Sequence, residues 1–63
     1  MDPEVCLAMA QDKSLFDSTR ALAARELRGW LERGGFVPAP YAERERIWLH
    51  AYLDELINKL EGQ

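Results

Sequence analysis

The chain has very few residues of the kinds that crosslink small proteins or bind metals in them. Its 63 residues include one cysteine, Cys6, and one histidine, His50. A single cysteine cannot close an intrachain disulfide, and one cysteine with one histidine cannot supply the four ligands of a structural zinc site. The sequence contains no cofactor-binding motif. We therefore expect a fold without a disulfide, a metal or a cofactor.

Long apolar runs are also missing. The most apolar stretch, residues 5–10, is far shorter than the roughly 20 residues that cross a membrane, and acidic rather than basic residues precede it. The net charge is −3, with acidic and basic residues spread along the chain, which argues against a nucleic-acid backbone as partner. A lone cysteine without a secretion signal fits a reducing compartment, so the expected location is cytoplasmic.

The short length limits how the chain can gain stability. A chain of 63 residues buries only about 60% of the surface that it exposes when unfolded, which places it near the lower size limit for folding alone. Chains this small usually rely on a disulfide, a metal or a partner subunit. With the first two excluded, we expect self-association or docking on another protein.

The N-terminal residues favour a short helix over about residues 3–11. Asp2 can cap its first turn, Pro3 suits the first helical position, and Glu4 interacts well with the positive end of the helix dipole. The residues that follow are apolar on every side of the helix. This helix is therefore expected to pack against the rest of the chain.

A second helix is expected over about residues 14–33. Ser14 and Asp17 resemble a capping box at its start, and the glycine pair at 34–35 ends it, since glycine accepts the left-handed conformation that follows a helix. The alternative is one helix continuous with the first, because no residue between them forbids it. The apolar face of the second helix is expected to contain Leu15, Phe16, Leu22, Ala23, Leu27, Trp30 and Leu31.

The last helix is expected over about residues 40–61, with Pro40 at its first position. At about 100° per residue its apolar side chains fall within an arc of roughly 180°, and a stripe this wide needs another surface to cover it. Ile47 and Ala51 lie outside the stripe, next to each other on the polar side, and are a candidate second contact surface. The stripe consists of Tyr41, Trp48, Leu49, Tyr52, Leu53, Leu56, Ile57 and Leu60.

The connection between the two long helices contains Pro38 and Pro40, each of which restricts the residue before it to extended geometry. Helices joined by so short a connection run antiparallel. The sequence therefore predicts one small all-α domain, an antiparallel helical hairpin with a short N-terminal helix. Two such hairpins packed face to face would form a four-helix bundle and bury the apolar stripe, so we expect a homodimer.

A chain with excess apolar surface and no recognisable set of catalytic residues is typical of an interaction protein. We expect a small non-enzymatic protein-interaction module, an adaptor or inhibitor, with no membrane and no small-molecule substrate as partner. His50 is interpreted as a surface histidine paired with Asp54 one turn away, and Cys6 as a small buried side chain. The expected interface residues are Trp30, Phe36, Tyr41, Ile47, Trp48, Ala51, Tyr52 and Leu56.

A nucleic-acid-binding regulator is the less favoured alternative. It would use the arginine-bearing face of helix 14–33. Only Arg25 and Arg28 share a side of that helix, so the basic residues form no continuous stripe, and the pattern favours a solvated face. The residues of this alternative are Arg20, Arg25, Arg28 and Arg33.

Overall fold

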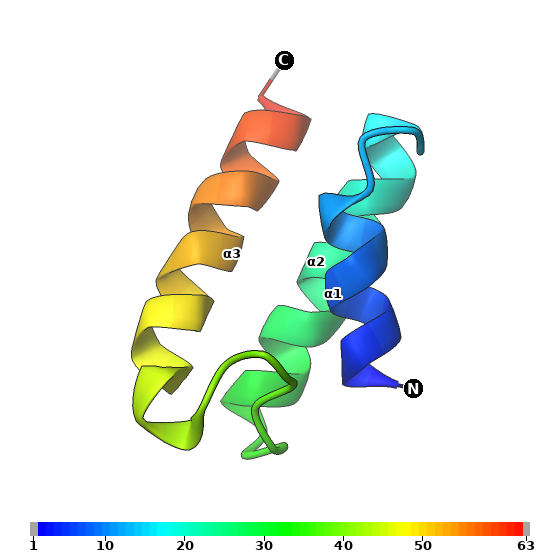
Figure 1. Ribbon diagram of the computed structural model, residues 1–63. Helices are drawn as coiled ribbons and strands as arrows, with labels where there is room; N and C mark the ends of the chain where they lie inside the picture. The colour runs from blue at the N-terminus through cyan, green and yellow to red at the C-terminus, as the bar shows by residue number, and fades with distance from the viewer. Residues whose placement is uncertain (1, 63) are drawn as a thin grey trace.

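The computed structural model describes residues 2–62, which form three α-helices and one short 3-10 helix (Figure 1). No strand occurs within the described residues. The expected all-α fold is therefore confirmed. The helices are α1 (Pro3–Gln11), α2 (Asp17–Glu32) and α3 (Arg46–Glu61), and the 3-10 helix is η1 (Glu43–Glu45).

The central helix is α2. Both α1 and α3 pack against it, and each helix runs antiparallel to the one before it in the chain (Figure 1). The connection between α2 and α3 lies at the end of the molecule where α1 begins, and α3 ends at the opposite end (Figure 1). The described residues occupy a volume with extents of 30 × 19 × 18 Å.

One hydrophobic core joins the three helices. Leu27 of α2 and Leu49 and Leu53 of α3 are completely buried. Ala24 of α2 is also completely buried, and its small side chain allows a neighbouring helix to approach closely. The core consists of Cys6, Leu7, Ala10, Ala23, Ala24, Leu27, Leu31, Leu49, Leu53 and Ile57.

Helix α1 provides cover that we had expected from a second copy of the chain. Cys6, Leu7 and Ala10 share the core with α2 and α3, so Leu53 at the centre of the α3 stripe is buried within a single chain. The buried stripe is narrower than expected, because Trp48, which we placed within it, is 61% exposed. Burial of the core therefore does not require two hairpins to pack through their inner faces.

Helix α2 begins at Asp17 rather than at residue 14. The reason lies in Asp12, whose Oδ1 accepts hydrogen bonds from the backbone N–H of Ser14 at 2.9 Å and from its hydroxyl at 2.6 Å. Both donors of Ser14 are thus used in a turn, and Ser14 does not cap the helix. Phe16 takes the N-cap position with no side-chain hydrogen bond. The turn separates α1 from α2, which excludes one continuous helix.

Helix α3 also begins later than expected, at Arg46 rather than at Pro40. The backbone N–H of Tyr41 donates a hydrogen bond of 3.0 Å to the carbonyl oxygen of Pro38, which closes a turn that contains Pro40. The single turn of η1 then precedes the α-helix. Pro40 therefore belongs to the connection and is not the first residue of the helix.

The apolar face of α2 differs in part from the expected one. Phe16 and Leu22 were expected on it, but they are 83% and 65% exposed. Ala23, Leu27 and Leu31 are buried as expected, and Ala21 and Ala24 are buried in addition. Because α1 and α3 both approach α2 on its alanine-bearing side, the larger side chains at its start remain outside the core.

The bend after α2 depends on its two glycines. Gly34 has a φ of 86°, in the left-handed region that most residues avoid. A Cβ at Gly35 would collide with the indole of Trp30. That indole donates a hydrogen bond of 2.7 Å from its Nε1 to the carbonyl oxygen of Phe36. The absence of a side chain at Gly35 thus lets the Trp30 ring lie over the bend.

Candidate functional site

The outer surface of α3 carries an apolar patch. Ile47 is 85% exposed and Trp48 is 61% exposed, and Ala51, one turn further along, is also exposed. The ring of Trp48 lies against the ring of Tyr41, with centroids 5.6 Å apart. Tyr52 is half-buried one turn after Trp48. We refer to Tyr41, Ile47, Trp48, Ala51 and Tyr52 as the α3 patch.

The other expected interface residues are Trp30, Phe36 and Leu56. Trp30 and Phe36 form a T-shaped ring pair in the bend after α2, with centroids 5.3 Å apart. Leu56 is half-buried and packs against the core. The aromatic rings near the bend are therefore arranged in two pairs, Trp30 with Phe36 and Tyr41 with Trp48.

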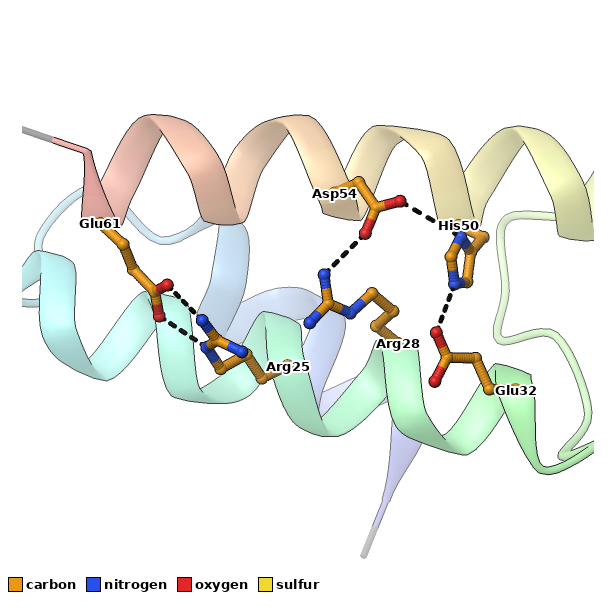
Figure 2. A network of polar contacts seen from close by, with 6 residues as sticks. All are labelled: Arg25, Arg28, Glu32, His50, Asp54 and Glu61. Carbon is orange, nitrogen blue, oxygen red and sulfur yellow. Dashed lines mark hydrogen bonds and ion pairs between the residues drawn. The ribbon is translucent and has the colours of Figure 1, made fainter.

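A row of ionic contacts joins α2 to α3 (Figure 2). Arg25 binds both carboxylate oxygens of Glu61, with its Nε 2.6 Å from Oε2. Arg28 Nη1 lies 2.6 Å from Asp54 Oδ1. We interpreted these two arginines as a solvated face, but each is paired with a carboxylate of the neighbouring helix. The sequence alone did not reveal these pairs, because their partners lie far away in the chain.

His50 belongs to the same row of contacts (Figure 2). Its Nδ1 lies 3.5 Å from Asp54 Oδ2, which is the helical neighbour that the sequence indicated. Its Nε2 lies closer, 2.7 Å, to Glu32 Oε2 at the end of α2. The imidazole therefore links the two helices through carboxylates on both of its nitrogen atoms.

The expected nucleic-acid-binding arginines are largely engaged within the chain. Arg20 donates a hydrogen bond of 3.0 Å from its Nε to the carbonyl oxygen of Ala10 in the last turn of α1. Arg25 and Arg28 are paired with acidic residues of α3, as described above. Arg33 follows the last residue of α2, where its backbone N–H donates to the carbonyl oxygen of Gly29. The carboxylate partners reduce the positive charge that this face of α2 presents.

These pairs change the titration of the groups that form them. The hydrogen bonds from Arg25 lower the pKa of Glu61 below its ordinary value, and the same contact raises the pKa of Arg25. A hydrogen bond from Arg46 likewise lowers the pKa of Glu43. The carboxylates consequently remain ionised at a lower pH in the folded chain than in the unfolded one.

Arg46 is a structural residue that the sequence reasoning did not single out. Its Nη1 donates to the carbonyl oxygen of Leu31 at 2.9 Å, and its Nη2 donates to the carbonyl oxygen of Gly35 at 2.7 Å. Glu43 accepts two further hydrogen bonds from the same guanidinium, at 2.6 and 2.9 Å. Alternating charges such as those of residues 43–46 are typical of a solvated helix start, so the sequence did not indicate that Arg46 contacts the backbone of α2.

No protein family matches this chain, and no curated protein or solved structure matches it. Within residues 2–62, no group of three or more His, Cys, Asp and Glu side chains is placed to hold a metal ion. None of the described helices has the length and apolar character needed to cross a membrane. Cys6 is 8% exposed, and burial raises the pKa of its thiol, which makes it a poor nucleophile at neutral pH.

Proposed function

We propose that the protein is a small non-enzymatic interaction module, an adaptor or inhibitor, that works as a homodimer formed through the α3 patch. The observation that supports this most directly is the exposure of Ile47, 85%, beside the exposed indole of Trp48. The opposite side of the same helix is anchored in the core by Leu49 and Leu53. The patch is therefore held on a rigid element, and tryptophan is among the residues that contribute most to interfaces.

A second copy suits this patch in shape and in charge. Ala51 lies one turn after Trp48, and its small side chain allows two helices to approach closely. If two α3 helices cross antiparallel about a two-fold axis midway between Trp48 and Ala51, Trp48 of one copy lies opposite Ala51 of the other, and Arg44 lies opposite Glu55. The patch would thus meet its own apolar residues at the centre and opposite charges towards the ends.

The expected dimer is weak. A standard interface buries about 800 Å² on each partner, which is about a fifth of the 4183 Å² surface of this chain. A contact made by one helix face is smaller than that, and such interfaces are typically transient. We therefore expect a dissociation constant in the micromolar range. We also propose a cytoplasmic location, which suits a lone cysteine held as a thiol.

The test is the mass in solution across a range of protein concentrations. Sedimentation equilibrium should show the 7.2 kDa chain at low micromolar concentration and a species of twice that mass at several hundred micromolar. Ala51→Glu should abolish the dimer, because it places two like charges near the two-fold axis, each against Trp48 of the other copy. Leu22→Ser is the control, since Leu22 is also apolar and exposed but lies on α2. A chain that stays monomeric throughout, or a dimer unaffected by Ala51→Glu, would refute the proposal.

Nucleic-acid binding is separated from this proposal by its salt dependence. Binding to phosphates weakens steeply as salt rises, whereas apolar association changes little. Fluorescence anisotropy with labelled duplex RNA at low and moderate salt is the measurement. Salt-sensitive binding that is lost in Arg25→Gln and Arg28→Gln would favour the alternative over the interaction module.

A further inference from the structure

A groove of about 400 Å³ lies where the end of α1 and the following turn meet the C-terminal half of α3. Both lysines of the chain, Lys13 and Lys59, line this groove, together with Arg20. The three cationic residues come from the turn, from α3 and from α2, so only the folded chain brings them together. The groove shares Tyr52 with the α3 patch, but its three cationic residues lie outside that patch.

Arg20 is the most deeply placed of the three cations. Its side chain is 12% exposed, and its Nε is used by the carbonyl oxygen of Ala10. The nearest carboxylate oxygen, on Asp17, lies 3.8 Å from Nη1, close to the outer limit of an ion pair, and the Asp17 side chain is 60% exposed. The Arg20 guanidinium is thus largely removed from water, and its contact with Asp17 is long, which leaves its Nη atoms able to donate hydrogen bonds to an anion.

The rest of the lining can contact the apolar part of a small ligand. Tyr52 and Leu56 are half-buried and present apolar surface to the groove. The Tyr52 hydroxyl accepts a hydrogen bond of 3.3 Å from Gln11 Nε2, which leaves its own proton available for donation. A ligand lying here would meet apolar side chains and at least one hydroxyl donor.

The charge of the groove differs from that of the whole chain. Three cations against one carboxylate, Glu55, give the lining a charge of +2, whereas the chain carries −3. Asp12 in the adjoining turn and Asp17 beside Arg20 lie outside this lining and offset part of its charge. Hydrogen bonds from Ser14 lower the pKa of Asp12, and the charge of Arg20 lowers it further, so this carboxylate stays ionised. The three cations nevertheless converge on one groove, where they attract an anion.

We propose that the groove binds an oxyanion, a phosphate or carboxylate group, carried by a small organic molecule. The charged group lies among Lys13, Arg20 and Lys59, and the apolar body of the ligand lies on Tyr52 and Leu56. Each lysine contributes a point charge on a flexible stem, and Arg20 supplies the fixed guanidinium. This site binds a small ligand and is distinct from the interaction function proposed above, although Tyr52 belongs to both surfaces.

The test is a titration of the isotope-labelled chain followed by NMR, with inorganic phosphate as the first probe and sodium chloride used to hold ionic strength constant. Saturable shifts are expected at the amides around Lys13, Arg20 and Lys59. The double variant Lys13→Gln/Lys59→Gln should weaken binding by about tenfold or more, because it removes two of the three cations that line the groove. Both lysines are exposed, so the variant should keep the fold.

The variant Arg33→Gln serves as the charge control, because it also removes a cation but at the far end of α2. It should leave phosphate binding unchanged. Equal weakening in the Arg33 and lysine variants, or shifts that do not saturate, would overturn the proposal by showing general charge attraction only. Phenyl phosphate is the second probe. It should bind more tightly than inorganic phosphate, and equal affinity would overturn the role assigned to Tyr52 and Leu56.

Discussion

Arg46, the first residue of α3, donates a hydrogen bond of 2.9 Å to the carbonyl oxygen of Leu31 in the last turn of α2. The last carbonyl groups of a helix have no partners within that helix. Here one of them is satisfied by the side chain that begins the next helix. The same guanidinium reaches the carbonyl oxygen of Gly35 at 2.7 Å. A single side chain thus links the two ends of the connection.

Replacing Arg46 should therefore lower the melting temperature. Arg46→Met keeps most of the side-chain length but leaves the carbonyl oxygens of Leu31 and Gly35 without their partner. Arg46→Lys should recover little of the lost stability, because an ammonium group cannot replace the planar guanidinium, which donates to both carbonyl oxygens at once. Thermal unfolding followed by circular dichroism is the measurement, with the exposed Arg44→Met as control. Equal melting temperatures for the two methionine variants would contradict the role of Arg46.

Gly34→Ala should destabilise the fold by about 1 kcal/mol. The cost comes from the backbone, because Gly34 has a φ of 86° and a Cβ there would meet no neighbouring atom. Gly34→Asn should cost less, since asparagine tolerates the left-handed region better. Gly29→Ala within α2 is the control and should be neutral or stabilising by up to about 1 kcal/mol. Urea unfolding curves measure all three, and a neutral Gly34→Ala would show that the bend does not hold this conformation.

Leu53→Ala should be far more harmful than any change in the α3 patch. Leu53 is completely buried, and truncation of a buried leucine costs about 2–5 kcal/mol. A domain of this size holds only about 3–5 kcal/mol in total, so much of the variant should be unfolded. Ile47→Ala, at a position 85% exposed, should change stability by less than about 0.5 kcal/mol in dilute solution. Similar losses in both variants would mean that α3 packs with another face.

Acid should destabilise the chain partly through Glu61. Its pKa in the folded chain is lowered by hydrogen bonds from Arg25, so the unfolded chain binds protons first as the pH falls. The stabilisation from this pair is complete above the ordinary glutamate pKa, near 4.3, and is lost as the pH falls through the lower folded value. Unfolding by urea at pH 7, 5 and 3 measures the loss. Glu61→Gln should reduce the difference between pH 5 and 3, and unchanged pH dependence in that variant would refute the assignment.

The thiol of Cys6 should react slowly in the native chain. Cys6 is 8% exposed, and burial raises its pKa, so both access and thiolate content are low. Alkylation by iodoacetamide at mildly alkaline pH should be at least about tenfold slower than in urea. Because Cys6 lies on α1 and is buried in the core, the rate of alkylation should depend on how often α1 detaches from α2. Leu7→Ala, which removes a core contact of α1, should accelerate it, and fast alkylation of the unmodified chain would show that α1 is not docked.

The parts of the fold that follow from local signals were predictable. Asp2 caps α1 as expected, its carboxylate accepting from the N–H of Glu4 at 2.9 Å. The position of Gly34 after α2 followed from the need for a left-handed residue at that point. These features depend on neighbours in the sequence, so a pattern of a few residues is enough to identify them.

The parts that depend on packing were not predictable. The core-facing side of α2 is set by where α1 and α3 lie, so the apolar residues Phe16 and Leu22 were placed inside although they are exposed. The start of α3 depends on a backbone hydrogen bond from Tyr41 to Pro38, which no local rule assigns. The carboxylate of Glu32 could not be paired with His50 before the relative position of two helices was known.

The order of the helices in space is the same as their order in the chain, since α2 touches the segment before it and the segment after it. Few distant parts of the chain must therefore find each other before any stabilising contact is gained. Topologies of this kind fold within microseconds to milliseconds, because closing a short loop costs little entropy. A chain with so small a core consequently spends little time as an exposed, aggregation-prone intermediate.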